Sequence, residues 1–546
     1  MRSEIDTLTL AATLNQTVDA YGSQEAYVGP DGRFTWEQIA EGSRQIAAAL
    51  IAAGIKKGDH VGLLLGNSAA WIQLFLGIGS IGAVTVPVNT RFKSEELQFC
   101  LKQADVRLLI FEDEFLRIDF CKLVEGAEPA INNQLPGSEL PQLYKAVMLG
   151  DHRAAPKGCE SFADFLSSGA GVSNTELLQY AEGVNKDDVL LIQYTSGTTS
   201  FPKGVMLSHA NMLLDAKAVA KRMGVRHDDR YFSIRPFFHV AGSTLSILVS
   251  INTGCCLLTL PKFDVSLNLE ILHKEKCSLI SGNDTIFLML MGHPNFDANK
   301  LSLRGGWAAA GPEVMEQIHS KMRIPNLCNA YGQSEASPNV LLSSYDDPLE
   351  LRIKGFGHPH PGIEVRLADP DTDTTKQPGE PGEIQVRGWN VMRGYYKMPE
   401  ATEKAFSKDG WLKTGDLGEM DSNGRFRMLS RLKDMYRVGG ENVAPSEVEE
   451  VLHAHPAVRQ AQVIGVPDSR LGEVTGAFVL LKDGHSALPD DLINWCKDRS
   501  ANFKVPRYLE IVETFENIGM TGSSKIQKNK LRDHAIKIWN LASAKK

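Results

Sequence analysis

A run of hydroxyl-bearing residues and glycines in the middle of the chain ends in a lysine. It covers residues 194–204, reads YTSGTTSFPKG and follows the apolar stretch 189–192. Accessible backbone N–H groups, hydroxyl donors and one positive charge are what a loop needs to hold phosphate oxygens. The run is not a Walker loop, because Pro202 precedes Lys203 and Gly204 follows it. The residue types alone therefore leave two alternatives of similar weight, a phosphate-binding loop and an ordinary polar loop.

Four charged residues further along the chain are further candidate site residues. Glu335 stands in a short polar turn, and a carboxylate is able to ligate Mg²⁺, which prefers oxygen ligands. Arg431 carries a guanidinium fork that suits oxyanions. Asp416 follows a glycine in a turn, and Lys525 follows the glycine- and serine-rich stretch 519–524. Taken singly, each is more simply explained as a local cap or a solvated surface charge.

Two less polar patterns can also be interpreted either as part of a ligand site or as ordinary core structure. His239 ends the apolar run FFH, and a histidine beside phenylalanines is most often a core residue. Residues 306–312 read GWAAAGP, and small side chains let a backbone approach a flat ring, although such turns are also common in cores.

The elements that must position these residues follow from the hydropathy pattern. Segments 60–66, 69–82 and 83–88 alternate short apolar runs with a longer helical one, which predicts parallel strands joined by helices. From about Gly355, β-branched runs cut by Gly and Pro predict a smaller antiparallel or barrel-like region. The predicted fold class is a multidomain α/β protein. Its large N-terminal domain would hold two βαβ-type subdomains plus a distorted β-barrel, followed by a small C-terminal α+β domain.

The boundary between the two domains is placed at a charged stretch. Residues 1–430 form the predicted large domain, 431–434 a hinge and 435–546 a small mobile domain. In the small domain, Pro445 at a first helical turn precedes apolar Val448, Val451 and Leu452, which predicts a helix. The stretches AQVIGVPD and TGAFVLLKDG then predict strands.

Size and composition exclude several classes of protein. The 546 residues, of 59.9 kDa, need more than one core. With 43% hydrophobic and 23% charged residues, the chain is typical of folded globular proteins. The net charge of -8 and pI near 6.0 give no general attraction to nucleic acid or anionic lipid.

The sequence also predicts a reducing, cytoplasmic setting. Charged residues interrupt the first six positions, where a secretory signal needs an apolar run. The apolar segments 72–88 and 244–260 are too short and too interrupted to span a membrane and predict buried core. The eight cysteines show no C-x-x-C pair, and Cys255 and Cys256 are predicted as buried thiols rather than a vicinal disulfide.

The segment YTSGTTxxPKGV resembles the phosphate-binding signature of the adenylate-forming (AMP-binding) superfamily, which includes acyl-CoA synthetases, peptide-synthetase adenylation domains and beetle luciferases. Further segments resemble the other signatures of this superfamily, in the same order, over residues 194–528. They are FFHVAG at 237–242, YGQSE at 331–335, GWLKTGD at 410–416, RLKD at 431–434, GGEN at 439–442 and KIQK at 525–528. The chain most resembles the acyl-CoA synthetase, or fatty-acid–CoA ligase, branch.

The resemblance implies a role for each matching residue. Lys525 is implied to stabilise adenylation, His239 to bind or gate the carboxylate, Glu335 to ligate Mg²⁺ and Lys433 to serve as the hinge. The residues implied to contact ATP or CoA are Thr195, Ser196, Gly197, Thr198, Thr199, Lys203, Ala309, Ala310, Gly311, Tyr331, Gly332, Ser334, Asp416, Arg431, Gly439, Gly440 and Glu441. Those implied to line the acyl pocket are Phe238, Gly242, Trp307, Ala308, Gly332 and Ser337.

Some positions depart from the family's pattern. Ser200 and Ser524 stand where the family commonly has glycine, and serine restricts the backbone and adds bulk. Closure of the phosphate loop and presentation of Lys525 are the features that these serines put in doubt.

The resemblance implies an ATP-dependent carboxylate:CoA ligase that works through an acyl-AMP intermediate, with ATP, Mg²⁺ and coenzyme A. The mixture of small and aromatic pocket residues predicts an apolar acid, of medium-chain fatty, alicyclic or aromatic type. A luciferase-like or stand-alone adenylating enzyme and a non-catalytic ATP binder are the alternatives. No nucleic-acid partner and no integral membrane segment are expected, and a homodimer is left open.

Overall fold

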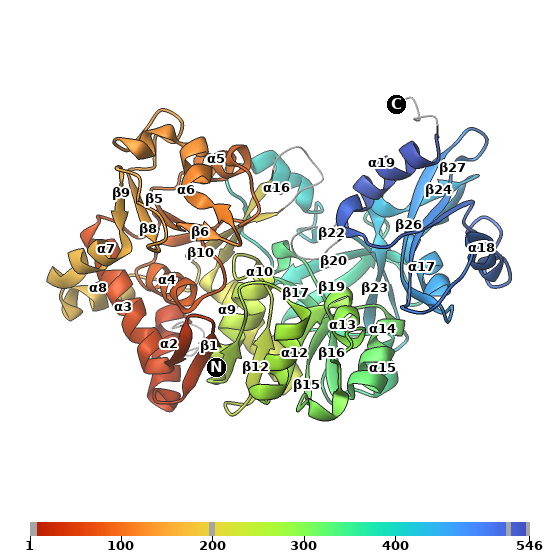
Figure 1. Cartoon of the computed structure of the whole chain (residues 1–546), viewed down its shortest axis with the longest axis horizontal. Helices are drawn as coiled ribbons and strands as arrows, with labels where there is room; N and C mark the ends of the chain where they lie inside the picture. Colours follow the sequence, from red (N-terminus) through yellow and green to blue (C-terminus); the bar gives the residue numbers. More distant parts are fainter. Residues whose placement is uncertain (1–7, 196–201, 520–525, 542–546) are drawn as a thin grey trace.

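A computed structural model describes residues 8–195, 202–519 and 526–541. Four larger sheets organise the chain, which runs from the red N-terminal helices to a blue domain at the other end of the molecule (Figure 1). A β-ribbon of two short strands, β6 (Glu114–Phe115) and β7 (Ile118–Asp119), adds a fifth pairing.

The largest sheet has nine strands and carries the predicted site residues Trp307, Ala308, Ala309, Tyr331 and Gly332. Its inner strands, from β16 to β1, run parallel, as the alternating sequence predicted. In spatial order the strands are β18 (His358–Pro359), β17 (Asn339–Leu342), β16 (Asn326–Gly332), β15 (Gly305–Ala309), β14 (Leu279–Asn283), β12 (Arg230–Ser233), β13 (Cys256–Leu258), β1 (Glu25–Gly29) and β2 (Gly32–Thr35).

A second sheet of eight strands is also largely parallel. The predicted strand–helix–strand unit at 60–88 is confirmed here as β3, α4 (Ala69–Ser80) and β4. In spatial order the strands are β21 (Gly394–Tyr395), β11 (Lys203–Ser208), β10 (Val189–Thr195), β4 (Val84–Pro87), β3 (His60–Leu64), β5 (Leu108–Glu112), β8 (Lys145–Leu149) and β9 (Cys159–Ser161).

One continuous core joins the two large sheets. The apolar helix α4, capped by Ser68, packs together with α3 (Trp36–Ala52) and α9 (His209–Met223) against residues of both sheets. The helix α9 begins with a capping box at Ser208 and Asn211 and ends at Gly224, whose φ of 60° favours glycine. The predicted burial of segments 72–88 and 244–260 is confirmed, and all eight cysteines are free thiols.

Other helices lie along the large domain and cover the sheets. They are α2 (Leu10–Tyr21), α5 (Ser94–Gln103), α6 (Phe120–Ala127), α7 (Phe162–Ser168), α8 (Asn174–Glu182), α10 (Val240–Gly242), α11 (Val249–Thr253), α12 (Val265–Lys274), α13 (Asp284–Met291), α14 (Pro312–Gln317), α15 (Leu349–Ile353) and α16 (Pro399–Ala405). A π-helix, η3 (Ser243–Leu248), lies between α10 and α11. Within the described residues, no helix is both long and apolar enough to cross a bilayer.

The antiparallel region predicted from residue 355 onward is confirmed as a four-stranded sheet. Its strands, in spatial order, are β19 (Ile363–Ala368), β20 (Gly382–Gly388), β22 (Leu412–Met420) and β23 (Phe426–Arg431). An isolated bridge between Gly357 and Phe426 ties β23 to the chain that enters this region. The sheet therefore stands at the end of the large domain, beside the blue small domain in Figure 1.

The small α+β domain has a core of its own, formed by buried residues between Tyr436 and Ala535. The helix predicted after Pro445 is α17 (Pro445–His453), and it buries Val448 and Leu452. The strands are β25 (Glu441–Val443), β24 (Tyr436–Val438), β27 (Gly472–Leu481), β26 (Val458–Asp468) and β28 (Tyr508–Ile511), and the other helices are α18 (Pro489–Lys497) and α19 (Lys528–Ile538).

A short 3-10 helix, η7 (Leu432–Asp434), connects the two domains at the predicted hinge. The small domain contacts the large one here, because Ser446 Oγ donates a hydrogen bond to Leu429 O at 2.5 Å. The limits 430, 434 and 435 themselves stay predictions.

Candidate active site

One group of predicted site residues lies where parallel strands of the nine-stranded sheet end. β12 leads to His239, β15 ends at Ala309 and β16 ends at Gly332. In open α/β sheets, the carboxyl ends of the strands form the crevice in which ligands bind. The topology therefore brings segments from three separate parts of the sequence to one edge.

The loop that follows β15 rises from the core to the surface. Trp307 and Ala308 are buried, whereas Ala309 and Gly311 are exposed and Ala310 is half-buried. Hydrogen bonds fix both ends of this passage, since Trp307 Nε1 donates to Tyr231 Oη at 3.0 Å and Asn329 Nδ2 donates to Ala310 O at 2.9 Å. The exposed alanine backbone suits a flat ring, and the buried tryptophan suits the floor of an adjoining pocket.

The turn between β16 and β17 is tightly folded. A Cβ on Gly332 would lie 1.9 Å from Pro338 O, so only glycine fits. Gln333 N donates to this same oxygen at 2.8 Å, and the 3-10 helix η6 (Ser334–Ala336) follows. Ser337 is buried at the end of the turn and donates to Asn390 O at 2.6 Å.

Glu335 is held within this turn by two contacts from a distant segment. Tyr395 Oη donates to Glu335 Oε1 at 2.9 Å, and Met392 N donates to the Glu335 carbonyl at 2.9 Å. Lys203 Nζ lies over the Tyr395 ring, 4.9 Å from its centroid. Tyr395 therefore connects the predicted phosphate lysine to the predicted metal ligand.

The hairpin of β10 and β11 presents that lysine. Thr195 and Lys203 are register partners at the end of the hairpin where β10 ends and β11 begins. The predicted phosphate-loop residues Ser196, Gly197, Thr198 and Thr199 lie outside the described residues.

A second polar group surrounds Asp416. This carboxylate is only 2% exposed, Tyr331 Oη donates to its Oδ2 at 2.7 Å, and Arg431 Nε lies 3.5 Å from its Oδ1. Arg431 is also the register partner of Asp416 across β22 and β23. Burial, together with the Asp416 charge, raises the pKa of Tyr331 well above its usual range. Tyr331, Asp416 and Arg431, all predicted nucleotide contacts, are thus joined by one hydrogen bond and one ion pair.

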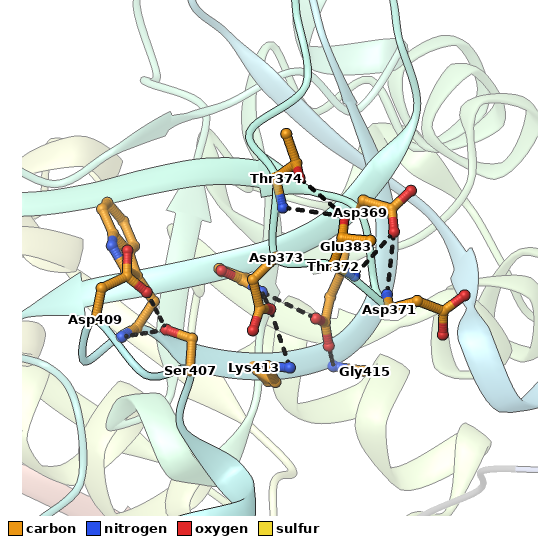
Figure 2. A network of polar contacts seen from close by, with 12 residues as sticks. Asp369, Asp371, Thr372, Asp373, Thr374, Glu383, Ser407, Asp409, Lys413 and Gly415 are labelled. Carbon is orange, nitrogen blue, oxygen red and sulfur yellow. Dashed lines mark hydrogen bonds and ion pairs between the residues drawn. The ribbon is translucent and has the colours of Figure 1, made fainter.

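Glu383 positions the turn that carries Asp416. It is buried, and its Oε1 accepts a hydrogen bond from Gly415 N at 2.9 Å, as Figure 2 shows. Thr414 Oγ1 donates to Ile384 O at 2.6 Å and fixes the turn from the other side. In the same network Lys413 Nζ pairs with Asp373 Oδ1 at 2.9 Å.

His239 is exposed, so the alternative that it is a buried core residue is wrong. Its Nδ1 caps α10 by accepting from Ala241 N at 3.1 Å. Phe238 beside it is half-buried, and Gly242 packs so closely that a Cβ there would lie 2.1 Å from Pro236 O. The tight turn thereby holds His239 at the surface of the same edge.

Nearly the whole length of the chain matches known proteins. The family model described as AMP-binding enzyme matches residues 14–396, and the model of the AMP-binding enzyme C-terminal domain matches residues 447–525. The chain belongs to the AMP-binding enzyme family.

Relatives of this AMP-binding enzyme include a putative acyl-CoA synthetase, YngI, of Bacillus subtilis, with 39% identity over 98% of both chains. The bovine mitochondrial medium-chain acyl-CoA ligase ACSF2 is 32% identical, over 98% of this chain and 88% of its own. A solved anthranilate CoA ligase, AuaEII, in complex with anthranoyl-AMP, has a TM-score of 0.85 and 26% identity over 98% of both chains.

The predicted enzyme class and reactants are confirmed by these matches. The AMP-binding enzyme is an acid–thiol ligase that forms an acyl-CoA through an acyl-AMP, with ATP, Mg²⁺ and CoA.

The described residues fit a nucleotide, since Asp416 offers a buried acceptor and Gln333 Nε2 is a buried donor without a hydrogen-bond partner among them. Within those residues no cluster of three or more metal-ligating side chains exists. A single carboxylate at Glu335 suits Mg²⁺, which keeps water and phosphate oxygens as its other ligands.

The remaining predicted residues belong to the small domain and the connector. Gly439, Gly440 and Glu441 lie in or beside the β24–β25 hairpin, where Gly439 N donates to Leu471 O, and no hydrogen bond or ion pair among the described residues links them to the sheet edge. Lys433 is in η7, and its partial burial lowers the pKa of its ammonium. Lys525 lies outside the described residues.

Sequence reasoning missed two residues that hold the site together. Tyr395 and Glu383 are far from the motifs they support, and no recognisable signature marks either one. Only the pairing of β21 with β11 and of β20 with β22 shows their role.

Proposed function

We propose that this enzyme activates an apolar carboxylic acid of medium-chain fatty, alicyclic or aromatic type. The observation that carries the proposal is the buried pair Trp307 and Ala308, which ends in the exposed alanine loop at the edge of the sheet. An acid that rests on this apolar floor would direct its carboxylate toward the polar groups on β16.

The names of the relatives support the same range of acids. One is named a medium-chain acyl-CoA ligase, and the solved neighbour AuaEII is named an anthranilate CoA ligase. A Rhodococcus jostii relative, 35% identical over 96% of this chain and 98% of its own, is named the ligase of a methyl-dioxo-octahydroindenyl propanoyl group, which is alicyclic.

In the proposed first half-reaction, a carboxylate oxygen of the acid attacks the α-phosphorus of ATP. The bond between the α-phosphorus and the bridging oxygen breaks, and pyrophosphate leaves. Asp416 would accept hydrogen bonds from the ribose, Arg431 and Lys203 would offset phosphate charge, and Glu335 would hold Mg²⁺, which neutralises the leaving phosphates. Lys525 would stabilise the charge that develops in this transition state.

In the proposed second half-reaction, the sulfur of CoA attacks the acyl carbonyl. The carbon–oxygen bond to phosphate breaks, AMP leaves, and the thiol proton passes to solvent. Gly439 and Gly440 would face the site after the small domain turns about Lys433, since no hydrogen bond or ion pair among the described residues joins them to it.

A pyrophosphate-release screen tests the proposal. The purified chain is mixed with ATP, Mg²⁺ and acetate, octanoate, cyclohexanepropanoate or benzoate, with and without CoA. We expect CoA-dependent AMP release and the highest kcat/KM with one of the three apolar acids. Highest kcat/KM with acetate would show that the apolar-pocket idea is wrong, and ATP binding without pyrophosphate release would favour a non-catalytic ATP binder.

A pair of tryptophan variants refines the screen. Trp307→Ala should change the order of preference among the acids, because it removes the pocket floor. Trp411→Ala should leave the order unchanged, since Trp411 packs with Arg366 and Arg387 in the four-stranded sheet.

The cytoplasmic location stays a prediction, and the homodimer stays open.

A further inference from the structure

Arg235 leaves the nine-stranded sheet at the same edge as the candidate active site. It stands two residues after the end of β12, and β12 pairs with β14, which pairs with the β15 strand of Trp307. The guanidinium carbon of Arg235 lies over the Trp307 ring, 5.4 Å from its centroid. A cation thus adjoins the residue proposed as the floor of the acyl pocket.

The backbone around Arg235 is fixed by a buried asparagine. Asn67 Nδ2 donates to Arg235 O at 3.0 Å and to Thr259 Oγ1 at 3.1 Å, while Asn67 Oδ1 accepts from Phe237 N at 2.8 Å. The indole of Trp307 is fixed as well, through its hydrogen bond to Tyr231. The backbone that carries the cation and the indole that it covers are therefore both fixed by hydrogen bonds within the protein.

The guanidinium of Arg235 lacks the partners that its neighbours have. Its Nε is buried without a hydrogen-bond partner, and among the described residues no side-chain hydrogen bond or ion pair involves this guanidinium. Arg230 in the same sheet pairs with Glu25 and Glu275, and Arg304 pairs with the buried Asp229.

An unpaired buried guanidinium is costly for the fold. Burial lowers the pKa of Arg235 to about 10, and the charges of Tyr231 and Asp284 only partly oppose this effect. A buried charge without hydrogen bonds costs folding free energy that a partner group would restore. Because Arg235 is not fully enclosed, a ligand can supply that partner.

We propose that Arg235 determines substrate specificity by binding an oxygen acceptor at the far end of the acid, either a carbonyl or a second carboxylate. This inference rests on the proposed function and narrows it, from apolar acids in general to acids whose apolar skeleton ends in such an oxygen.

The position of Arg235 in the sheet separates it from the reacting carboxylate. β12 is three strands from β16, which leads to Glu335, and strands lie about 4.8 Å apart, so the two strands are roughly 14 Å apart. Trp307 on β15 stands between them. An acid whose carboxylate reacts beside Glu335 would therefore reach Arg235 only with its distal end. Of the two roles implied for His239, which follows Arg235 on the same loop, this placement fits gating by an exposed side chain and not binding of the reacting carboxylate.

The test compares acids of equal length in the intact enzyme. We would measure pyrophosphate release with octanoate, 7-oxooctanoate and octanedioate, and with the corresponding six- and ten-carbon sets. At one or more lengths, kcat/KM should be about 10- to 100-fold higher for an oxygen-bearing acid than for the plain acid. The oxo and dicarboxylic members show which acceptor is recognised.

Variants of Arg235 complete the test. Arg235→Met should abolish the preference, chiefly through KM for the acid, and should leave KM for ATP and CoA unchanged. Arg235→Lys should retain part of a preference for the diacid. The preference is a ratio within one protein, so it stays informative even if a variant is less stable. Arg366→Met is the matched control, because Arg366 also stacks on a tryptophan, at 4.6 Å, but pairs with Asp409.

Two results would overturn the inference. One is a wild-type enzyme that prefers the plain acid at every length, and the other is a preference that survives in Arg235→Met. Either result, with pyrophosphate still released from the apolar acids, would leave the proposed function standing. If no acid of any set releases pyrophosphate, the proposed function is wrong, and this inference falls with it.

Discussion

The proposed binding of Mg²⁺ depends on one carboxylate, that of Glu335, which Tyr395 holds by a hydrogen bond. Glu335→Gln keeps the shape and the contact with Tyr395 but removes the negative charge that would face Mg²⁺. We expect kcat/KM for ATP in pyrophosphate release to fall at least about tenfold, as for loss of a hydrogen-bonded charge, with a higher Mg²⁺ requirement. Titrations of ATP and Mg²⁺ measure both effects.

Tyr395→Phe is the matched control for this prediction. It removes the hydroxyl that donates to Glu335 and keeps the ring under Lys203. Its effect on ATP and Mg²⁺ use should be smaller than that of Glu335→Gln, because the carboxylate remains. Unchanged affinities in Glu335→Gln would remove Glu335 from the metal site.

His209 makes the large domain sensitive to acid. It is fully buried, accepts a hydrogen bond from Leu10 N, and burial lowers its pKa to about 4. An unfolded histidine has a pKa of about 6.5, so between these values the unfolded state binds the extra proton. The contribution of His209 to the free energy of unfolding is therefore fully present above about pH 6.5. It falls as the pH decreases toward 4, by up to about 1.4 kcal/mol per pH unit.

A histidine substitution measures this linkage. His209→Gln keeps an acceptor for Leu10 but does not titrate, so it should lose less thermal stability than wild type between pH 7 and pH 5. His152→Gln is the control, since that side chain is 80% exposed. Equal losses in wild type and His209→Gln would show that other groups cause the acid sensitivity.

The sequence predicted residues that belong to a recognisable motif. It did not predict residues whose role depends on which side chains the fold brings next to them. Asp416, Arg431 and Tyr331 were predicted together, and the structure joins them by an ion pair and a hydrogen bond. Arg235 could not have been singled out, because its significance is the lack of a partner among the side chains that the fold brings near it.

At the scale of elements, the β16–β17 turn depends on the close approach of two backbone segments. Gly332→Ala would place a methyl group 1.9 Å from Pro338 O, which is backbone and cannot rotate away. The turn must shift and displace Tyr331 and Glu335, so adenylation should fall by about 10² or more, as when preorganised groups are misplaced. Pyrophosphate release and the thermal midpoint are the measurements.

The control for this turn is a glycine with free space around it. A Cβ on Gly171 would meet nothing within 4 Å, so Gly171→Ala should keep both activity and stability. Wild-type adenylation in Gly332→Ala would show that the turn is not rigid.

Regular elements were predicted where their pattern is local. The unit at 60–88 and the helix after Pro445 have clear periodicity, caps or flanking glycines, and both were found. The π-helix at 243–248 was not predicted, because its sequence is uniformly apolar or small and an α-helix would bury it equally well. The support of the Asp416 turn by Glu383 depends on strand pairing, which no single segment encodes.

At the scale of the whole molecule, one small domain is proposed to serve two half-reactions in turn. Lys525→Ala should slow acyl-adenylate formation by about 10² to 10³, since it removes one donor to developing charge, while synthetic acyl-adenylate plus CoA should react nearly as in wild type. Lys433→Pro should do the opposite, because proline fixes φ and removes an N–H at the connector, and should release pyrophosphate but transfer poorly to CoA.

Separate assays of the two half-reactions give the decisive comparison. Circular dichroism of each variant controls for folding, and general destabilisation would lower both rates in both variants. Equal loss of the two half-reactions in a folded Lys525→Ala enzyme would contradict the alternation.

The register of β22 and β23 would couple nucleotide binding to the orientation of the small domain. Arg431 is the partner of the proposed ribose acceptor Asp416 and directly precedes the η7 connector, so nucleotide and linker share one residue. In the proposed site, affinity for the nucleotide and orientation of the small domain are then linked quantities, and linkage is reciprocal. If AMP favours one orientation by a given factor, any influence that imposes that orientation must strengthen AMP binding correspondingly. The strength of product inhibition by AMP would thus depend on the connector between the domains as much as on the nucleotide site itself.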